Sequence, residues 1–172
     1  MVSDTQWLNP DEQHTWRSFL TANRLFFDGI ERQLQQESGL PHAYYEILVR
    51  LSEAPDRQLR MSGLASTSLS SRSRISHAVA RLEESGWVRR MPCRDDKRGA
   101  IAELTDEGLT RLEGIAPAHV DAVRRGLFDA LSSAQVAALR DISDTLVAHL
   151  SDGPVWPASG DPGPSAGARD GR

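Results

Sequence analysis

The sequence predicts a mainly α-helical protein that carries one small β-hairpin. Apolar residues recur every three or four positions through most of the first 150 residues, which is the spacing of amphipathic helices. The exception lies between residues 87 and 104. There Trp87–Arg90 and Ala100–Leu104 alternate apolar with polar side chains on the two sides of a charged loop, as the strands of a hairpin do.

The first two predicted helices are separated by a glycine. The apolar spacing predicts a long helix over about Asp11–Glu37, and Asn9, which is followed by a proline, caps it. Gly39 ends this helix, and a second helix is expected over about Pro41–Glu53. The sequence Ala54-Pro55-Asp56 then predicts a turn.

Three shorter elements come next. We expect a short helix over about Met61–Ser66, a serine-rich turn over Ser66–Ser71 and a further helix over about Ser71–Glu84. Gly86 stands where the C-terminal stop of a helix is expected. The inward face of the helix over 71–84 consists of Ile75, Val79 and Leu82.

Two helices are predicted after the hairpin. Thr105 caps the first of them, and Pro117, which lies within its apolar stripe, should kink or restart it. Ser132 and Gln135 form a capping-box pattern for a last helix that ends near Leu150. The chain beyond is rich in Gly, Pro, Ala and Ser, and we expect residues 151–172 to form a disordered tail.

The formal net charge of −4 is unevenly distributed along the chain. Residues 57–98 hold ten Lys and Arg and four acidic residues, a net of +6, so the remainder carries a net of −10. A basic middle of this kind attracts phosphate. Because Cys93 is the single cysteine, no intrachain disulfide is possible. No secretory signal or membrane-spanning run is evident, so we expect a cytoplasmic protein without a membrane partner.

The order helix, helix, short helix, turn, helix and two-stranded wing describes a winged helix-turn-helix. An α-helix fits the major groove of DNA, where base edges can be distinguished, and the helix over 71–84 is the candidate for this role. The alternative is an ordinary solvated helix with surface arginines. The candidate DNA-contacting residues on it are Ser71, Arg72, Ser73, Arg74, Ser76, His77 and Arg81.

The loop of the hairpin supplies a second candidate contact. Arg94, Lys97 and Arg98 crowd its tip, and Gly99 permits a sharp turn of the backbone there. Cations on a flexible tip can enter the minor groove, where the negative potential is enhanced. A charged surface hairpin without such a role is the plainer interpretation, but helix and wing together are much more specific than either alone.

Short motifs follow one another through the predicted helix-turn-helix and wing. They are Leu64-Ala65, Ser71-Arg72-Ser73-Arg74-Ile75-Ser76-His77-Ala78-Val79, Arg81-Leu82-Glu83, Gly86-Trp87-Val88-Arg89-Arg90, Asp96-Lys97-Arg98 and Leu104-Thr105-Asp106-Glu107-Gly108. In this order the chain resembles the MarR family of winged-helix regulators, over roughly residues 15–150.

The resemblance implies a transcriptional regulator that binds double-stranded DNA as an obligate homodimer. It implies a pseudo-palindromic operator, with two recognition helices in successive major grooves, and repression as the commonest mode of action. The expected division is a helical dimerisation region over 9–40 and 109–150, which flanks a winged helix-turn-helix domain over 41–108. The surplus of apolar residues on the terminal helices agrees with it, since exposed apolar patches usually mark an interface.

The resemblance also implies a small phenolic or anionic effector that releases the DNA. In the family such molecules often bind between the dimerisation helices and the DNA-binding lobe. The candidate ligand-binding residues are Trp16, Phe19, His42, Tyr44 and Tyr45, which combine apolar area with a few polar tips. The plainer interpretation is that Trp16 and Phe19 belong to the core.

Other function classes find less support. The five histidines are scattered, no metal-ligand cluster or phosphate loop is evident, and neither a cofactor nor an enzymatic activity is expected. A winged helix that serves only as a protein–protein interaction module remains the alternative. Cys93 is expected on the exposed hairpin, away from the first helix, so we do not expect it to act as an essential peroxide sensor.

Overall fold

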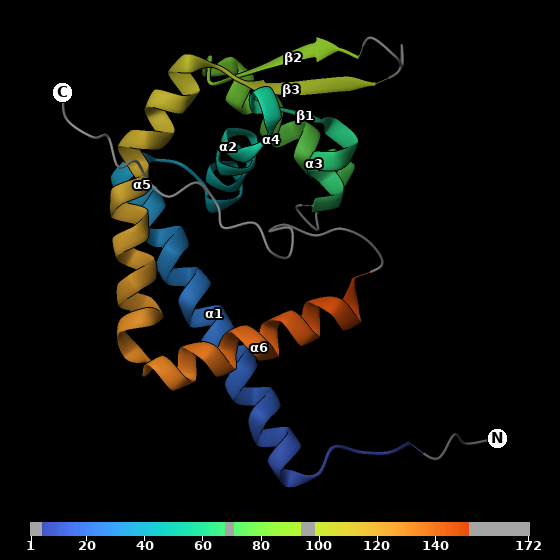
Figure 1. Ribbon diagram of the computed structural model, residues 1–172, viewed down its shortest axis with the longest axis vertical. Helices are drawn as coiled ribbons and strands as arrows, with labels where there is room; N and C mark the ends of the chain where they lie inside the picture. The colour runs from blue at the N-terminus through green and yellow to red at the C-terminus, as the bar shows by residue number, and fades with distance from the viewer. Residues whose placement is uncertain (1–4, 68–70, 94–98, 152–172) are drawn as a thin grey trace.

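The computed structural model describes residues 5–67, 71–93 and 99–151. The mainly α-helical architecture with a small wing is confirmed, and its elements appear in Figure 1. The elements are α1 (Pro10–Ser38), α2 (His42–Glu53), η1 (Pro55–Arg57), β1 (Gln58–Arg60), α3 (Met61–Thr67), α4 (Arg72–Glu84), β2 (Val88–Pro92), β3 (Ala100–Leu104), α5 (Asp106–Gly126), η2 (Phe128–Ala130) and α6 (Ser133–Leu150).

The helix caps read from the sequence are confirmed. The Asn9 side chain accepts from the Glu12 amide at 2.9 Å, and the Glu12 carboxylate accepts from the Asn9 amide at 2.7 Å, so α1 begins with a complete capping box. Ser132 begins α6 in the same way. Gly39 follows α1 with a φ of 68°, a left-handed conformation that glycine adopts without strain. These caps explain why the helix boundaries follow the sequence pattern closely.

The sheet has three strands, one more than expected. Its order is β1-β3-β2 and all pairs are antiparallel. Leu59 of β1 faces Ala102 of β3, and Val88 of β2 faces Leu104 of β3. The two-strand prediction was therefore incomplete: Gln58–Arg60 adds a third strand that is only three residues long, too short to show an alternating pattern.

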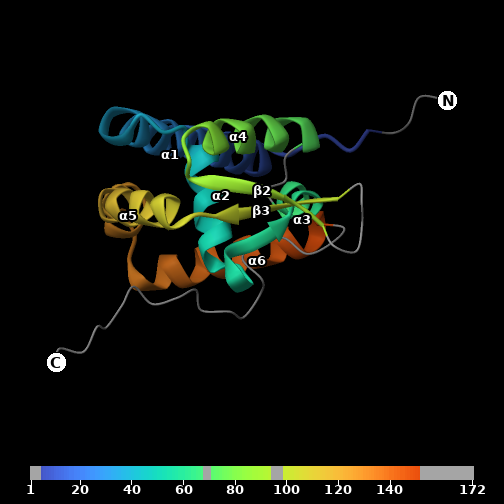
Figure 2. The same cartoon turned by 90° about the horizontal axis from the view of Figure 1, so that it is seen from above.

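One hydrophobic core joins α2, α3, α4, the sheet and the ends of α1 and α5 that meet them. Helix α2 packs against α1, α4, α5 and the sheet, and Figure 2 shows it in the middle of the molecule. Each large side chain in this core contributes about 1.5–3 kcal/mol through removal from water. Its largest fully buried members are Leu34, Ile47, Leu48, Leu51, Leu64, Val79, Leu82 and Val88.

The terminal helices contribute little to this core. Helix α1 buries only Ile30 and Leu34, and α6 has no buried residue. Helix α5 lies beside α1 (Figure 1) and continues through Pro117 as one helix, so of the two expected effects of this proline, a kink or a restart, the restart does not occur. Much of the apolar surface of α1 and α6 is therefore exposed in a single protomer. The larger exposed side chains are Trp16, Phe19, Leu20, Leu25, Phe27, Leu139, Ile142, Leu146, Val147 and Leu150.

Candidate nucleic-acid interface

Helix α4 is held rigidly against the core by one face. Ser71 caps its N-terminus, where the hydroxyl accepts from the Arg74 amide at 3.3 Å. Gly86, with a φ of 76°, follows the C-terminus. Ile75, Val79 and Leu82 are buried, as the sequence predicted, and Ala78 joins them. Because the buried face leaves α4 no freedom to rotate, the identity of its outward residues is fixed.

The outward face of α4 carries every candidate that the sequence placed there. Ser71, Arg72, Ser73, Arg74, Ser76, His77 and Arg81 are all exposed. Arg81 also pairs with Glu84 at 2.8 Å on the same helix. The other side chains supply cations, hydroxyls and an imidazole, the groups that hydrogen-bond to base edges and phosphates.

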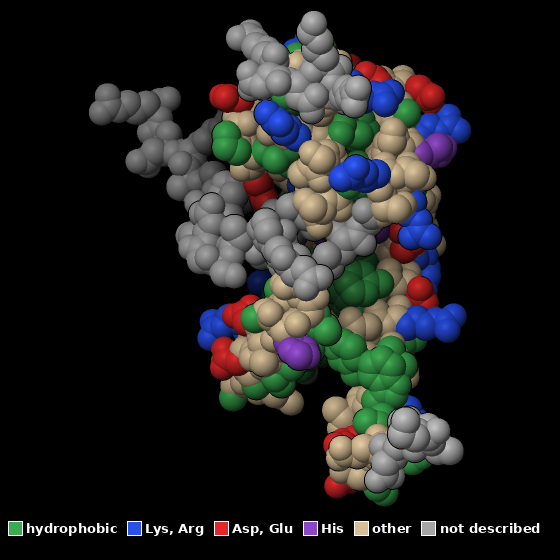
Figure 3. Space-filling model, turned by 90° about the vertical axis from the view of Figure 1, so that its right-hand side faces the viewer, with side chains coloured by type: hydrophobic (Ala, Val, Ile, Leu, Met, Phe, Trp, Pro, Cys, Tyr) green, Lys and Arg blue, Asp and Glu red, His purple; other side chains and the backbone are tan. Residues whose placement is uncertain are grey.

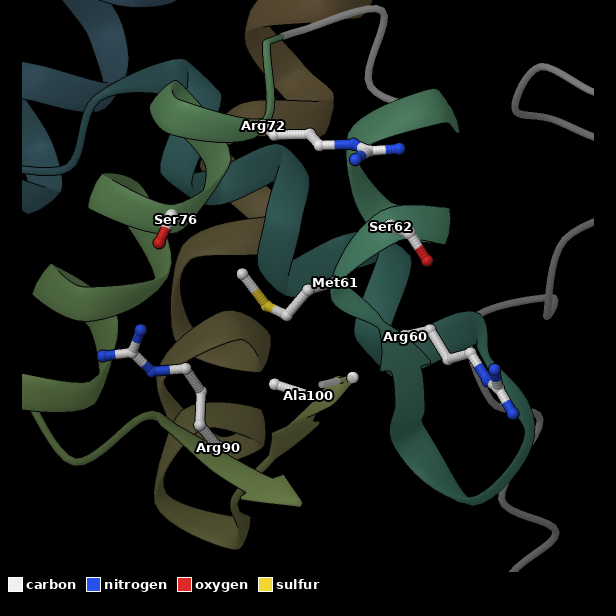
Figure 4. A pocket seen from close by; sticks show the side chains of 8 residues that line it. Arg60, Met61, Ser62, Arg72, Ser76, Arg90 and Ala100 are labelled. Carbon is white, nitrogen blue, oxygen red and sulfur yellow. The ribbon is translucent and has the colours of Figure 1, made fainter. Parts of the chain in front are cut away.

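A hollow of about 420 Å³ lies beside this face, between α3, α4 and the sheet. Figure 4 shows Ser76 on α4 at one side of it, Ser62 on α3 at the other, and Met61 between them. Three arginines from three elements also line it, namely Arg60, Arg72 and Arg90. Cations gathered around a hollow next to α4 suit an anionic group such as a phosphate.

Arg60 and Arg90 also line this hollow, and the sequence reasoning did not single them out. They lie 30 residues apart on different strands, and only the fold brings them to α4. Arg90 is fixed there by Glu83, whose carboxylate lies 2.6 Å from its guanidinium. Hydrogen bonds from Arg90 lower the pKa of Glu83. The basic charge of residues 57–98 was the available signal, although it identified no individual residue.

The tip of the wing lies outside the described residues, so Arg94, Lys97 and Arg98 have no described placement. The base of the hairpin is described: the Cys93 amide donates to the Gly99 carbonyl at 3.0 Å. Cys93 itself is buried, with 7% of its surface exposed. The expectation that it lies exposed on the hairpin was therefore wrong: Cys93 lies at the closed base of the wing, directly after the last paired residue of β2.

The five candidate ligand-binding residues lie at three places in the protomer. His42 and Tyr45 both contact the ring of His119 on α5. Tyr44 lines a separate hollow with Ser73, Arg74 and His77 of α4. Trp16 and Phe19 stack on each other in the exposed part of α1.

A single protomer does not bring these three places together. Phe27 contacts His42, and Trp16 lies 11 residues earlier on α1, a rise of about 16 Å along a helix. The candidate ligand-binding set therefore stays a prediction, and it would require a second protomer. Within the described residues no cluster of three or more potential metal ligands occurs, and no helix there is long and apolar enough to cross a membrane.

Comparison with known proteins identifies the family. A family model described as "MarR family" matches residues 38–99. The fold superposes on Sco3205, a MarR family transcriptional regulator from Streptomyces coelicolor solved in complex with DNA, with a TM-score of 0.83 and 49% identity over 87% of this chain and 93% of that one. The chain belongs to the MarR family. MarR family proteins are transcriptional regulators and not enzymes.

Two further relatives are also transcriptional regulators. AbsC, another MarR family regulator from Streptomyces coelicolor, shares 41% identity over 85% of this chain and 98% of its own, with a TM-score of 0.80. The transcriptional repressor YetL from Bacillus subtilis is 32% identical over 111 residues, which are 63% of this chain and 66% of YetL. The match thus spans just under two thirds of YetL.

Proposed function

We propose that this MarR family protein is a sequence-specific regulator that binds a pseudo-palindromic operator in double-stranded DNA. The observation that carries the proposal is the exposed face of α4, with Arg72 and Ser76 beside the hollow that Arg60 and Arg90 also line. Ser73 and His77 face outward on the same helix and would contact base edges in the major groove. The arginines around the hollow would contact phosphates, and Arg94, Lys97 and Arg98 of the wing would reach the minor groove. The similarity to Sco3205, a regulator solved in complex with DNA, supports this proposal.

The active form that we propose is a homodimer. The exposed apolar side chains of α1 and α6 support it, among them Trp16 at 51% and Ile142 at 58% exposed. Figure 3 shows hydrophobic side chains gathered on the lower part of the molecule, where these helices lie. Two protomers joined there would present two α4 helices to successive major grooves. The dimerisation helices would be those of residues 9–40 and 109–150, around a DNA-binding domain of residues 41–108.

The proposal has three further parts. The protein represses transcription, a small phenolic or anionic effector releases it from the DNA, and it is located in the cytoplasm. YetL is named a repressor. A ligand releases DNA only if it binds more tightly to a dimer whose recognition helices are wrongly spaced. Trp16 and Phe19 of one protomer, together with His42 and Tyr45 of the other, are the residues that we propose for such a pocket, whereas Tyr44 lines the separate hollow beside α4.

The test is selection of genomic DNA fragments by the purified protein, followed by gel shifts on the fragments recovered. We expect a shared pseudo-palindrome and nanomolar-range binding at physiological salt, roughly 10⁻⁸–10⁻¹¹ M. Arg98→Ala should weaken binding to it substantially. Enrichment of no common sequence would refute the proposal and favour a protein–protein interaction module instead.

A further inference from the structure

The start of α5 is bonded to the turn that ends α4. The Thr105 hydroxyl donates to the Gly86 carbonyl at 2.7 Å, and the Thr105 amide donates to the Trp87 carbonyl at 3.0 Å. One turn later, a Cβ at Gly108 would lie only 2.1 Å from the same Trp87 carbonyl oxygen. Because the contacts are this close, the end of α4 moves only together with the start of α5.

Arg111, one turn further along α5, connects this junction to α1. Its guanidinium carbon lies 5.4 Å from the centre of the Trp87 ring. A terminal nitrogen of the same group donates to the carbonyl of Ser38, the last residue of α1, at 2.7 Å. A planar guanidinium can stack on a ring and donate in its own plane at once, which a lysine ammonium cannot do. One side chain thus joins the ends of α4 and α1.

Arg111 makes both contacts from a partly buried position near the start of α5. Arg111 also lies at the opposite end of α5 from the exposed apolar surface of α6, and Figure 1 shows α1 and α5 extending side by side from this junction.

We propose that Arg111 is a positioning residue that sets the separation of the two α4 helices in the dimer, by fixing the end of α4 to the end of α1. This inference rests on the proposed function, since it requires a DNA-bound dimer. Arg111 itself contacts no DNA in this scheme. The two α4 helices of a dimer can bind successive half-sites only if they lie about one turn of DNA apart. A hinge between α4 and α1 would let the distance between them vary.

The experiment measures discrimination between operator spacings. The affinities of wild type, Arg111→Gln and Arg111→Lys are measured on three operators. These are the operator recovered by genomic selection and two variants of it, whose half-sites lie one base pair closer together or one base pair farther apart. Arg124→Gln is the matched control, because Arg124 is an exposed arginine on the same helix, 3.9 Å from Asp129. Sedimentation and thermal unfolding confirm that each variant is a folded dimer.

We expect wild type and Arg124→Gln to prefer the original spacing by about tenfold or more, the usual cost of one unfavourable base-pair change. Arg111→Gln should lose most of this preference and bind all three operators with similar affinity. The preference of Arg111→Lys for the original spacing should lie between those of wild type and Arg111→Gln. If Arg111→Gln does not fold, the comparison of Arg111→Lys with wild type tests the inference. Unchanged discrimination in the Arg111 variants, or none in wild type, overturns the inference while the proposed function stands. If wild type binds no operator, the proposed function fails and this inference with it.

Discussion

His42 and His119 face each other across the junction of α2 and α5, with ring centroids 6.2 Å apart and planes 29° from parallel. The centroid of the Tyr45 ring lies 4.3 Å from that of the His119 ring. Burial lowers the pKa of His119, and the neighbouring His42 lowers it further. Burial also raises the pKa of Tyr45 to about 12, so its hydroxyl stays protonated at neutral pH. Both groups are therefore neutral in the folded protein at neutral pH.

This cluster predicts that the protein loses stability in mild acid. Below the ordinary histidine pKa the unfolded chain takes up a proton at residue 119, whereas folded His119 does so only at lower pH. The free energy of unfolding should therefore fall as the pH drops from the ordinary histidine pKa to the lowered pKa of His119. Below that lowered pKa the contribution of His119 should no longer change. Urea denaturation at about pH 7.5 and about pH 5.5 measures the loss. His119→Gln should reduce it, and His149→Gln, at an exposed position, should not. An equal loss in wild type and His119→Gln would contradict the assignment.

Arg72 and His77 should have different effects on DNA binding although both lie on the outward face of α4. Arg72 lines the hollow assigned to phosphate, so Arg72→Ala should weaken binding to all sequences alike and lower the salt slope by about 0.9. His77→Ala should change base preference at one position, by about 1–3 kcal/mol. Binding titrations over a salt series and a set of single-base operator variants separate the two effects.

Arg24→Ala provides the control for that experiment. Arg24 lies on α1 with 85% of its side chain exposed and pairs weakly with Asp28 at 3.7 Å. Its removal should leave the salt slope unchanged. If Arg24→Ala lowers the slope as much as Arg72→Ala does, the phosphate assignment of the hollow is wrong.

Glu83 and Arg90 should fix the angle between α4 and the wing. One carboxylate oxygen accepts from the Arg90 amide at 3.1 Å and the other from its Nε at 2.7 Å. The pair is about one-third exposed on each side, so Glu83→Gln should cost only about 0.2–1 kcal/mol of stability. Since Arg90 lowers the pKa of Glu83, this contribution is present above the ordinary carboxyl pKa and is lost as the pH falls through the lowered value.

The larger effect of Glu83→Gln should appear in DNA affinity, because Arg90 lines the hollow beside α4. Glu84→Gln is the matched control, as Glu84 pairs with Arg81 within α4 alone. Chemical denaturation and operator titration of both variants give the comparison. Equal operator affinity for the two variants would show that the Glu83–Arg90 contact does not position the wing.

The apolar side of α6 should be required for dimerisation. Leu139 and Ile142 are 37% and 58% exposed in the protomer, and a charge on each would have to be buried in a dimer. The double change Leu139→Asp and Ile142→Asp should give a monomer that binds no operator, whereas Ala148→Asp on the other side of α6 should remain dimeric. Analytical ultracentrifugation at micromolar concentration reads the outcome. A monomeric wild type would rule out the proposed dimer.

The sequence predicted most helices because each has local signals of its own. The caps at Asn9, Thr105 and Ser132 and the stops at Gly39 and Gly86 are chemical features of single residues. The three apolar positions assigned to the buried face of α4 also predicted which residues of this helix are exposed. These features depend on neighbours within about four residues, and a single sequence displays them.

What the sequence could not predict depends on residues far apart in the chain. Strand β1 exists because β3 pairs with it, and Cys93 is buried because the wing closes at Gly99. Arg60 and Arg90 reach α4 only through the folded sheet. Helix α5 likewise does not restart at Pro117, since packing can outweigh intrinsic preference.

The fit of Gly108 against the Trp87 carbonyl has a genetic consequence. Any side chain at residue 108 forces a shift between the Trp87 carbonyl, just after α4, and the start of α5, whereas the exposed apolar side chains lie on α1 and α6. A mutant subunit would therefore still pair with a wild-type partner and leave the pair with one misplaced recognition helix. We expect Gly108 alleles to be dominant in a strain that also carries the normal gene, as alleles altered at the DNA-contacting residues would be, although Gly108 itself touches no DNA.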